Sequence, residues 1–239
     1  MDTKFLLEKA KKVAVSAGKY LNNFKDKSKD IYKVSHRDIK LELDRSTEAL
    51  IRQQLDETEI PVYGEELGGT RTSEFFWVVD PLDGTSNYFR GLDQCCISIA
   101  LMHDKESIIG VIYNFNTDEL YYASKNNGAY CNGSKIKTSL IKNKEKATLT
   151  TGFPSSETIN SSLNFLEGLH KWNKVRMFGS AALSCAYVAA GKCDVYLEKG
   201  VYLWDIAAGI CLVKEAEGKV NFDILDENRY TVKFSNKFL

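Results

Sequence analysis

The sequence predicts an α+β fold in which helices pack against mixed β-sheets. An amphipathic helical pattern covers residues 3–25 at the start of the chain. Apolar runs then follow one another through the middle of the chain, as consecutive antiparallel strands do, at 75–79, 95–102, 107–114 and 118–123. In the second half, strands and helices alternate, which is typical of helices that cover the faces of a sheet.

The first elements are two helices separated by a charged stretch. Phe5 and Leu21 belong to a set of apolar residues that recur at helical spacing, so the first helix is expected to be structural. Residues 25–37 are mostly charged or polar and are predicted to form a loop. A second helix is predicted over 44–55, with Asp44 as its N-cap.

Turns rich in asparagine separate the later strands. Asn116-Thr117-Asp118 is predicted to join two strands as a hairpin, and Asn126-Asn127-Gly128 and Asn132-Gly133 are predicted to form further turns. The remaining predicted elements are strands near 147–151, 175–178, 193–197 and 230–234, and helices over 156–172, 180–190 and 204–216. No internal repeat and no low-complexity linker interrupts them.

Composition argues against several classes of function. Of the 239 residues, 44% are hydrophobic, which is enough to bury a substantial core, and 32 Lys and Arg balance 32 Asp and Glu. A zero net charge gives no indication of a nucleic-acid partner. No apolar run approaches the roughly 20 residues that span a bilayer, and the charged N-terminal residues do not fit a signal peptide, so no membrane association is expected.

The cysteines indicate a reducing compartment. There are six of them, none in a Cys-x-x-Cys pair and none at zinc-type spacing. Several stand among apolar residues, as Cys211 does between Ile210 and Leu212. They are therefore predicted to be buried thiols, and the protein is predicted to be cytoplasmic.

The most informative motif is Asp80-Pro81-Leu82-Asp83-Gly84-Thr85, directly after the apolar run at 75–79. Its two carboxylates can leave the strand end together, and the carbonyl oxygen of Leu82 adds another hard ligand, a set that suits Mg²⁺. Gly84 and Thr85 allow a turn into a helix whose first N–H groups can bind an anion. Taken alone, the motif is as compatible with a solvated turn, since Asp-Pro and Asp-Gly are common turn dipeptides.

Two further acidic segments favour the metal site over the turn. Gly64-Glu65-Glu66 ends another short apolar run, and Asp205 opens a helix of small and apolar residues far downstream. A carboxylate in such a helix serves as an N-cap or as a ligand, because a buried charge without a partner is costly. The three segments together predict a divalent-metal site beside a phosphate-binding turn.

These segments resemble the signatures of the lithium-sensitive inositol monophosphatase family, within the Mg²⁺-dependent sugar phosphatase superfamily. The matching stretches, in order, are Gly64-Glu65-Glu66, residues 77–88, Gly179-Ser180-Ala181-Ala182-Leu183, residues 194–198 and residues 204–218. The resemblance implies a layered α-β-α-β-α sandwich, and it implies a homodimer. It further implies one domain over residues 1–239, with sub-halves of approximately 1–140 and 141–239 that meet at the active site. Many family members carry one more C-terminal helix, and its absence from this sequence affects the expected outer layer.

The resemblance also implies a set of metal ligands. Mg²⁺ would be held by Glu65, Asp80, the carbonyl of Leu82, Asp83 and Asp205. Asp83 would bridge two cations about 4 Å apart, which can clamp the attacking and leaving oxygens of a phosphoryl transfer and lower the pKa of bound water. Catalytic roles would fall to Glu65 and Asp83 and also to Thr85, which would position the water and donate a hydrogen bond to Asp44. A plain helix cap is the alternative for Asp44.

Substrate contacts are implied in the same way, at Gly84, Thr85, Gly179, Ser180, Ala181, Glu198 and Asp205. The backbone N–H groups of Gly84 and Thr85 would bind the phosphate, and residues 179–181 would contact substrate hydroxyls. Glu198 would accept hydrogen bonds from those hydroxyls, the alternative being a solvated surface glutamate. Lys33 would lie near the mouth of the site, although any lysine of its charged stretch can simply be solvated.

The chain departs from the family pattern at two places. Lys40-Leu41-Glu42-Leu43 precedes Asp44, where the family usually has Val-Thr, so a local hydroxyl is missing. Lys219 stands where a second glycine would follow Gly218. In contrast, Asn87-Tyr88 resembles the inositol monophosphatase branch more than the nucleotide bisphosphatase branch.

The sequence therefore predicts a Mg²⁺-dependent phosphomonoesterase that hydrolyses a sugar or cyclitol monophosphate, such as inositol 1-phosphate, by metal-activated water. The same chemistry on adenosine 3′,5′-bisphosphate, fructose 1,6-bisphosphate or histidinol phosphate stays open. A non-enzymatic regulatory scaffold is a further alternative. It is disfavoured because a scaffold has little use for four converging carboxylates.

Overall fold

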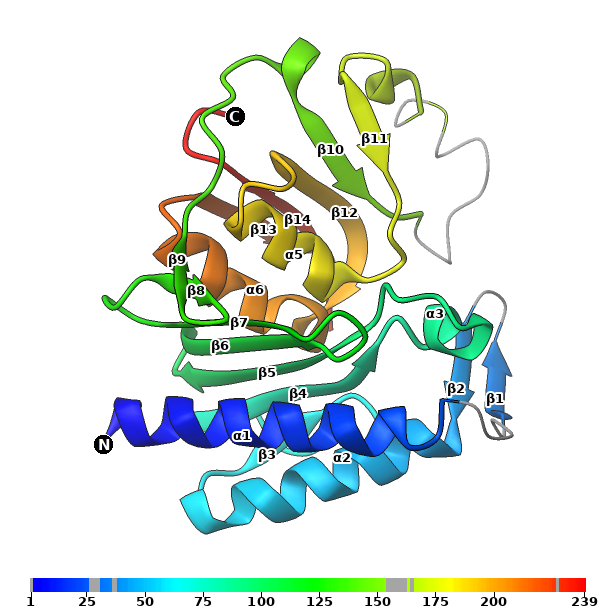
Figure 1. Cartoon of the computed structure of the whole chain (residues 1–239), viewed down its shortest axis with the longest axis vertical. Coiled ribbons are helices and arrows are strands. Elements are labelled where there is room, and N and C mark those ends of the chain that lie inside the picture. Colours follow the sequence, from blue (N-terminus) through cyan, green and yellow to red (C-terminus); the bar gives the residue numbers. More distant parts are fainter. Residues whose placement is uncertain (1, 26–30, 36–37, 154–162, 164–165, 227) are drawn as a thin grey trace.

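Helices and sheets alternate in layers through the molecule (Figure 1). The computed structural model describes every residue except 1, 26–30, 36–37, 154–162, 164–165 and 227. Its helices are α1 (Thr3–Asn22), α2 (Glu42–Leu55), α3 (Thr85–Arg90), α5 (Ala181–Ala189) and α6 (Leu203–Glu215), with short 3-10 helices at Asp56–Thr58 and Lys144–Lys146. None of the helices in this described part has the length and hydrophobicity that a membrane crossing requires.

The strands form three sheets. The seven-stranded sheet runs in the order β3 (Val62–Gly64), β4 (Phe75–Asp83), β5 (Cys96–His103), β6 (Glu106–Asn114), β7 (Glu119–Ser124), β8 (Ala129–Cys131) and β9 (Ser134–Ile136). The five-stranded sheet runs in the order β11 (Lys174–Arg176), β10 (Thr148–Thr151), β12 (Val195–Tyr202), β14 (Arg229–Ser235) and β13 (Lys219–Ile224). β1 (Ile31–Ser35) and β2 (Asp38–Leu41) form a separate antiparallel pair.

The seven-stranded sheet is buried on both faces, which explains its continuous apolar strands. In β4, Trp77 and Val79 face one core, shared with α1 and α2. Phe76 and Val78 face the other core, shared with α5 and α6. The five-stranded sheet closes the far side of α5 and α6, so the described layers are helices, sheet, helices and sheet (Figure 1). This confirms the predicted α+β fold.

Small residues let the middle helical layer approach its neighbours closely. A Cβ added to Gly110 of β6 would stand 2.3 Å from the carbonyl oxygen of Ala208 in α6. A Cβ on Gly209 would stand 2.3 Å from the Cβ of Cys185 in α5. Since α5 and α6 both begin at the cavity described below, this tight contact fixes the spacing between their N-termini.

Several predicted elements need correction. The charged stretch at 25–37, predicted as a loop, contains β1. α2 begins at Glu42, so Asp44 lies in its first turn and is not its N-cap. The strand predicted at 75–79 continues through Asp83, because β5 keeps pairing with it across an irregularity between Asp80 and Asp83.

Other expectations were incomplete. The short strands β8 and β9 flank the predicted turns at 126–128 and 132–133 and were not predicted themselves. β13, most of whose polar and apolar residues are exposed, was not predicted either. Of the helix predicted over 156–172, residues 166–169 are helical, and most of its first half lies outside the described residues. The described residues therefore account for four of the five expected layers.

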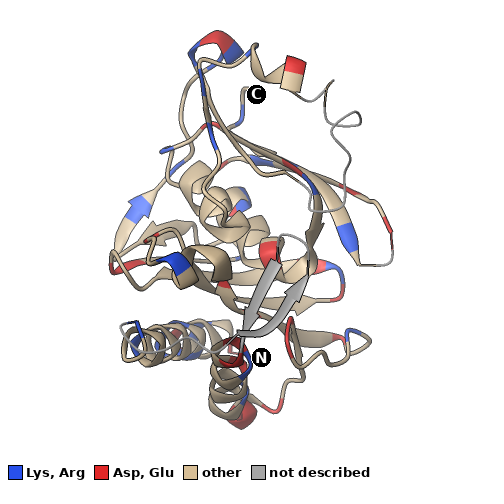
Figure 2. Cartoon of the chain, turned by 90° about the vertical axis from the view of Figure 1, so that its right-hand side faces the viewer, with Lys and Arg blue, Asp and Glu red and all other residues tan. Residues whose placement is uncertain are grey.

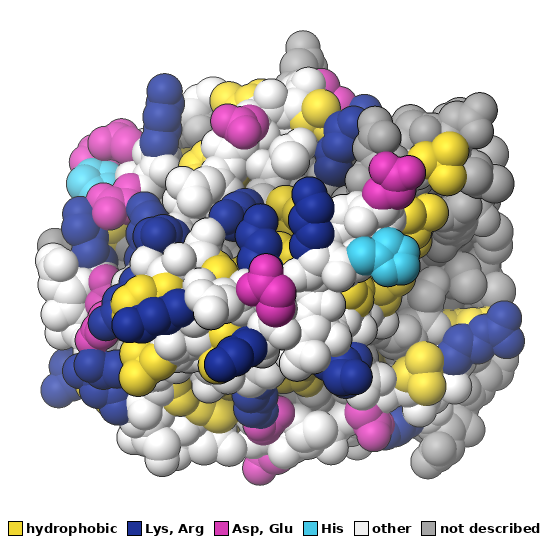
Figure 3. Space-filling model, turned by 90° about the horizontal axis from the view of Figure 1, so that it is seen from above, with side chains coloured by type: hydrophobic (Ala, Val, Ile, Leu, Met, Phe, Trp, Pro, Cys, Tyr) yellow, Lys and Arg dark blue, Asp and Glu magenta, His cyan; other side chains and the backbone are white. Residues whose placement is uncertain are grey.

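Charged residues are not evenly distributed over the surface. Acidic and basic residues occur on both helices and sheets (Figure 2). Seen from above, lysine and arginine side chains gather beside apolar ones (Figure 3). Near the C-terminus, Lys142 and Lys237 lie 5.0 and 5.3 Å from the ring centre of Phe238. The zero net charge of the sequence thus conceals a local basic surface.

Gly209→Ala tests the close approach of α5 and α6. A helical glycine is normally replaced by alanine with a gain in stability, but here the new methyl group would overlap Cys185. We expect the free energy of unfolding to fall by about 1–3 kcal/mol, as for other overpacked cores. Urea denaturation measures it, with Gly168→Ala as the control because its added methyl meets no atom within 4 Å. Equal effects of the two substitutions would contradict the packing argument.

Candidate active site

A cavity of about 410 Å³ opens between the two large sheets, where β4, β10 and β12 end and α3, α5 and α6 begin. The described residues that line it are Glu65, Asp80, Leu82, Asp83, Gly84, Thr85, Ser86, Thr151, Gly152, Phe153, Gly179, Ser180, Ala181, Ser184, Glu198, Lys199, Gly200, Val201, Tyr202, Trp204 and Asp205. The structure therefore brings together all the site residues predicted from the sequence except Asp44. Both sequence halves contribute to the lining.

The end of β4 delivers two carboxylates to the cavity. Asp80 pairs with Ser98 and Asp83 with Cys96, and the register shifts between these two pairs. Pro81 cannot donate a ladder hydrogen bond, so an irregularity at this point is expected. Asp80 is 2% exposed and Asp83 is 9% exposed.

Asp83 is fixed by the beginning of α5. Its carboxylate accepts hydrogen bonds from the hydroxyl of Ser180, the N–H of Ala182 at 2.8 Å and the N–H of Ala181 at 3.3 Å. The thiol of Cys96 donates to it at 3.7 Å. One side chain thus links the acidic motif of the first half of the chain to the turn at 179–181 in the second half.

The other two acidic residues are also positioned by backbone hydrogen bonds. Asp205 is the third residue of α6, and its carboxylate accepts a 2.7 Å hydrogen bond from the N–H of Tyr202. Glu65 follows β3, and its N–H donates to the carbonyl of Val79 at 3.2 Å. This bond sets Glu65 beside the residue that precedes Asp80.

Burial and mutual repulsion dominate the electrostatics of the cavity. The pKa of Asp80 is raised well above its usual range by burial, then by Glu65, Asp83 and Asp205. The pKa of Asp205 is raised well above its usual range by burial, then by Asp83 and Glu65. Burial also raises the pKa of Asp83, although hydrogen bonds from Ser180 and Ala182 oppose the shift. No lysine or arginine is among the strongest influences on the pKa values of these three carboxyl groups.

The donor set suits a hard divalent cation. Five carboxylates, those of the four predicted metal ligands and of Glu198, line one cavity together with Leu82, and no imidazole or thiolate is among the described lining residues. In this conformation, no group of three or more acidic, histidine or cysteine side chains among the described residues is arranged to hold a metal ion. Repelling carboxylates are expected to stand apart until a cation or protons neutralise them.

The turn after Asp83 has the geometry predicted for it. Gly84 has φ of 91°, and a Cβ there would lie 2.7 Å from the carbonyl oxygen of Gln94, so only glycine fits. α3 begins at Thr85, whose hydroxyl donates to the carbonyl of Leu82 at 3.0 Å. The hydrogen bond from Thr85 to Asp44 remains a prediction. Asp44 is 2% exposed, and it is not among the described lining residues of the cavity.

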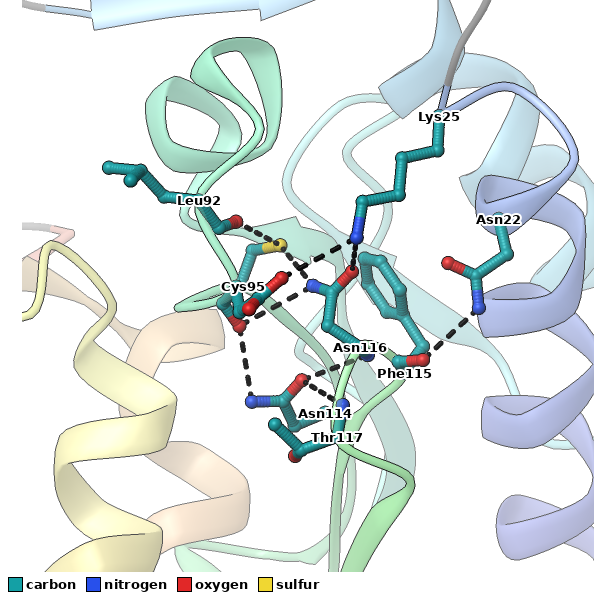
Figure 4. A network of polar contacts seen from close by, with 9 residues as sticks. Asn22, Lys25, Leu92, Cys95, Asn114, Phe115, Asn116 and Thr117 are labelled. Carbon is teal, nitrogen blue, oxygen red and sulfur yellow. Dashed lines mark hydrogen bonds and ion pairs between the residues drawn. The ribbon is translucent and has the colours of Figure 1, made fainter.

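A network of polar contacts around Cys95 and Asn116 lies next to this turn (Figure 4). Cys95 packs against Gly84, with its Cα 3.2 Å from where a Cβ would stand. The amide of Asn116 donates to the sulfur of Cys95 at 3.2 Å and accepts a hydrogen bond from the ammonium of Lys25 at 2.8 Å (Figure 4). The end of α1 and the β6–β7 connection therefore brace the turn at Gly84 and Thr85.

Asn87 has a role that sequence reasoning missed. Its side-chain amide donates to the carbonyls of Gln94 and Phe178, both at 2.7 Å, and it does not line the cavity. It joins α3 to the segment that carries Gly179. Besides the resemblance of Asn87-Tyr88 to the inositol monophosphatase branch, the structure gives Asn87 a bridging role.

Glu198 lies at the end of the cavity that β12 forms. The hydroxyl of Tyr196 donates to its carboxylate at 3.0 Å. Burial raises the pKa of Glu198 to about 7, against the hydrogen bond from Tyr196. Gly152 was not predicted, yet a Cβ there would stand 2.4 Å from the Glu198 carboxylate. Its place directly after the strand predicted at 147–151 was the signal that could have identified it.

The expected position of Lys33 near the mouth of the site stays a prediction. Lys33 belongs to β1. Its side chain lies outside the described residues.

The chain is similar to known proteins over most of its length. The family model described as "Inositol monophosphatase family" matches residues 2–230. The Nus factor SuhB of Xylella fastidiosa is 38% identical over 216 residues, which cover 87% of this chain and 78% of that protein. The fructose-1,6-bisphosphatase/inositol-1-monophosphatase of Aquifex aeolicus is 35% identical over 220 residues, which cover 89% and 83%. The solved structure of the inositol monophosphatase from Anabaena superposes with a TM-score of 0.87 at 30% identity and covers 100% of this chain and 93% of that one.

Glu198→Gln tests how much the ionised Glu198 carboxylate lowers the free energy of unfolding. The ordinary pKa is 4.5 and the folded pKa is about 7, so ionisation in the folded state costs stability as pH rises through this interval. At pH 8 the metal-free variant should exceed the wild type in free energy of unfolding by roughly 1–2 kcal/mol, after allowance for solvent in the cavity. At pH 4.5 the two should nearly coincide. Urea denaturation with a chelator measures both, and a difference independent of pH would refute the assignment.

Proposed function

The chain belongs to the inositol monophosphatase family and is a phosphatase, and we propose that it hydrolyses a sugar or cyclitol monophosphate with water as the nucleophile. The observation that carries this proposal is the convergence of Glu65, Asp80, Asp83 and Asp205 on one cavity. Three of these groups have raised pKa values because they are buried together. Such a cluster of carboxylates is typical of a site that binds cations.

Mg²⁺ is the proposed cofactor, because the donors that face the cavity are all oxygen atoms. Glu65, Asp80, the carbonyl of Leu82, Asp83 and Asp205 would hold it. When bound, Mg²⁺ supplies positive charge for the phosphate oxygens and lowers the pKa of coordinated water. The catalytic set proposed here comprises Glu65, Asp83, Thr85 and Asp44.

The chain's own residues orient the reactants. The N–H groups of Gly84 and Thr85 would bind the phosphate. Thr85 directs its hydroxyl proton to the carbonyl of Leu82, so its oxygen can accept a hydrogen bond from the attacking water. In the alternative that the family resemblance implies, Asp44 would accept that proton in place of the Leu82 carbonyl and would orient the same hydroxyl.

The second half of the chain would recognise the leaving group. Gly179, Ser180 and Ala181 line the cavity opposite the phosphate-binding turn, and Glu198 and Asp205 lie beside them. A volume of about 410 Å³ is in the range of small-molecule sites and accommodates one sugar ring with its phosphate. With a pKa of about 7, Glu198 can accept hydrogen bonds from substrate hydroxyls when it is ionised.

A substrate with two phosphates is the second candidate. Lys199 lines the same cavity as Glu198 and brings a positive charge to it. The relative from Aquifex aeolicus carries both fructose-1,6-bisphosphatase and inositol-1-monophosphatase in its name. Phosphate release from inositol 1-phosphate, fructose 1,6-bisphosphate, adenosine 3′,5′-bisphosphate and histidinol phosphate separates these candidates. A regulatory role, suggested by the name of the Xylella fastidiosa relative, would gain support if none were hydrolysed.

Three further proposals rest on the family resemblance. They are inhibition by lithium, a homodimer and a single domain over residues 1–239. A cytoplasmic location is proposed from the cysteines, which are free thiols in the structure. The single domain is also supported by the cavity, which residues of both sub-halves line.

Asp80→Asn tests the metal site. Because repulsion among the carboxylates is relieved, the metal-free variant should be more stable than the wild type at pH 8. The stabilisation by Mg²⁺, which is about 2.7 kcal/mol at a concentration 100 times the Kd, should be largely lost. Phosphatase activity should fall by about 100-fold or more, or about 2.7 kcal/mol. Thermal denaturation with and without Mg²⁺ measures the first two effects, with the exposed Asp56→Asn as control. An unchanged Mg²⁺ response in Asp80→Asn would exclude Asp80 as a ligand.

Glu198→Gln tests substrate selection. Loss of an anionic acceptor for vicinal hydroxyls should raise KM for the sugar phosphate by about tenfold to a hundredfold, or ~1.4–2.8 kcal/mol. Hydrolysis of an aryl phosphate, which offers no hydroxyls, should barely change. Steady-state kinetics on both substrates gives the answer. Equal losses would mean that Glu198 acts on the phosphate or the metal.

A further inference from the structure

An ion pair in α2, between the buried Glu48 and the partly exposed Arg52, holds the turn that carries Glu65. Glu48 is completely buried, and its carboxylate accepts hydrogen bonds from the N–H of Glu66 at 2.7 Å and the N–H of Leu67 at 3.2 Å. The guanidinium of Arg52 donates to the same carboxylate at 2.8 Å. Arg52 also donates to the carbonyls of Val62 and Gly68, at the two ends of this turn.

The turn is shaped to admit the Glu48 carboxylate. A Cβ added to Gly64 would stand 2.2 Å from a carboxylate oxygen of Glu48, so a larger residue at position 64 would displace it. Gly64 in turn donates its N–H to the carbonyl of Gly68 at 2.8 Å, which closes the turn. The backbone of residues 64–68 is therefore held by Glu48 of α2 and by its own hydrogen bond between Gly64 and Gly68.

The same turn is aligned with the other acidic strand. The N–H of Glu65 donates to the carbonyl of Val79, next to Asp80. Gly64 and Glu65 are thus tied to β4, while the next residues, Glu66 and Leu67, are tied to Glu48.

A buried ion pair is weak evidence for stability, because desolvation offsets much of its Coulomb energy. Its value here is geometric, since one carboxylate satisfies two N–H groups of a tight turn and orients the residue before them. We propose that Glu48 is a positioning residue for the metal site, which acts through the 64–68 turn to hold Glu65 at ligand distance. Arg52 supports it by fixing the carboxylate and both ends of the turn. The proposal rests on the function proposed above.

The position of Glu48 extends the argument to α2 as a whole. Asp44 and Glu48 are one helical turn apart, and both are buried, so they lie on the same face of α2. One side chain is proposed to orient Thr85, and the other orients the turn of Glu65. A single rigid helix would then set the distance between the water-positioning residue and one metal ligand.

The experiment measures Mg²⁺ affinity of the intact folded protein by isothermal titration calorimetry, beside steady-state kinetics. Glu48→Gln should weaken Mg²⁺ binding by about tenfold, the usual effect of removing a residue that supports a ligand. Saturating Mg²⁺ should restore most of kcat, and KM for the substrate should change little. Arg52→Lys, which keeps the charge but loses the fork of donors, should show a smaller loss in the same direction and serves if Glu48→Gln does not fold.

Two controls separate positioning from general destabilisation. Ile51→Ala removes a fully buried side chain from the same helix and should lower the melting temperature without weakening Mg²⁺ binding. In a Glu65→Ala background, Glu48→Gln should have no further effect on Mg²⁺ affinity, because the residue it positions is gone. An equal loss of affinity in Ile51→Ala, or additive losses in the double variant, would overturn the proposal. A wild-type protein that binds no Mg²⁺ would instead refute the proposed function.

Discussion

Repulsion among buried carboxylates is the constraint on which the rest of the site depends. Asp80, Asp83 and Asp205 are crowded into one cavity, where burial raises each pKa and neighbouring carboxylates raise the pKa values of Asp80 and Asp205 further. Nothing in that crowding favours folding, so other interactions must hold the groups in place. Each carboxylate accepts a hydrogen bond from a backbone N–H, at Leu82, Ala182 and Tyr202 respectively. The charges are thus fixed by the ends of strands and helices, whose positions the packed layers determine.

The two cores supply that rigidity. β4 carries Trp77 and Val79 into one core and Phe76 and Val78 into the other. Because side chains alternate between the two faces, a shift of one residue would exchange both sets at once and misplace Asp80 and Asp83. A strand buried on both faces cannot slide to relieve the repulsion at its end. The same double burial makes the strand easy to recognise in the sequence, since it removes polar residues from both faces.

Sequence alone revealed the residues whose signal is local. Asp80, Asp83 and Gly84 form one short motif after an apolar run, and the start of α5 at Ser180 and Ala181 has an N-cap signal. Glu48, Asn87 and Gly152 make their contacts with residues of other elements. No local sequence pattern shows which distant groups a residue will contact in the folded chain. The prediction of Asp44 as an N-cap was wrong for the opposite reason. Aspartate is a common N-cap residue and gives a local signal, but the helix begins at Glu42. Propensity does not determine where a helix starts when the preceding strand, β2, runs directly into it.

Asp83 would connect the proposed metal site to the proposed substrate contacts through one carboxylate. One of its oxygens accepts from Ser180 and from the N–H of Ala182 at 2.8 Å, while the other accepts a longer bond, 3.3 Å, from Ala181. The second oxygen is therefore the better placed of the two to turn toward a cation. The first stays at the N-terminus of α5, where the helix dipole favours negative charge. A cation at Asp83 and a substrate hydroxyl at residues 179–181 would then share one rigid support, so the position of the metal and the position of the leaving group are set together.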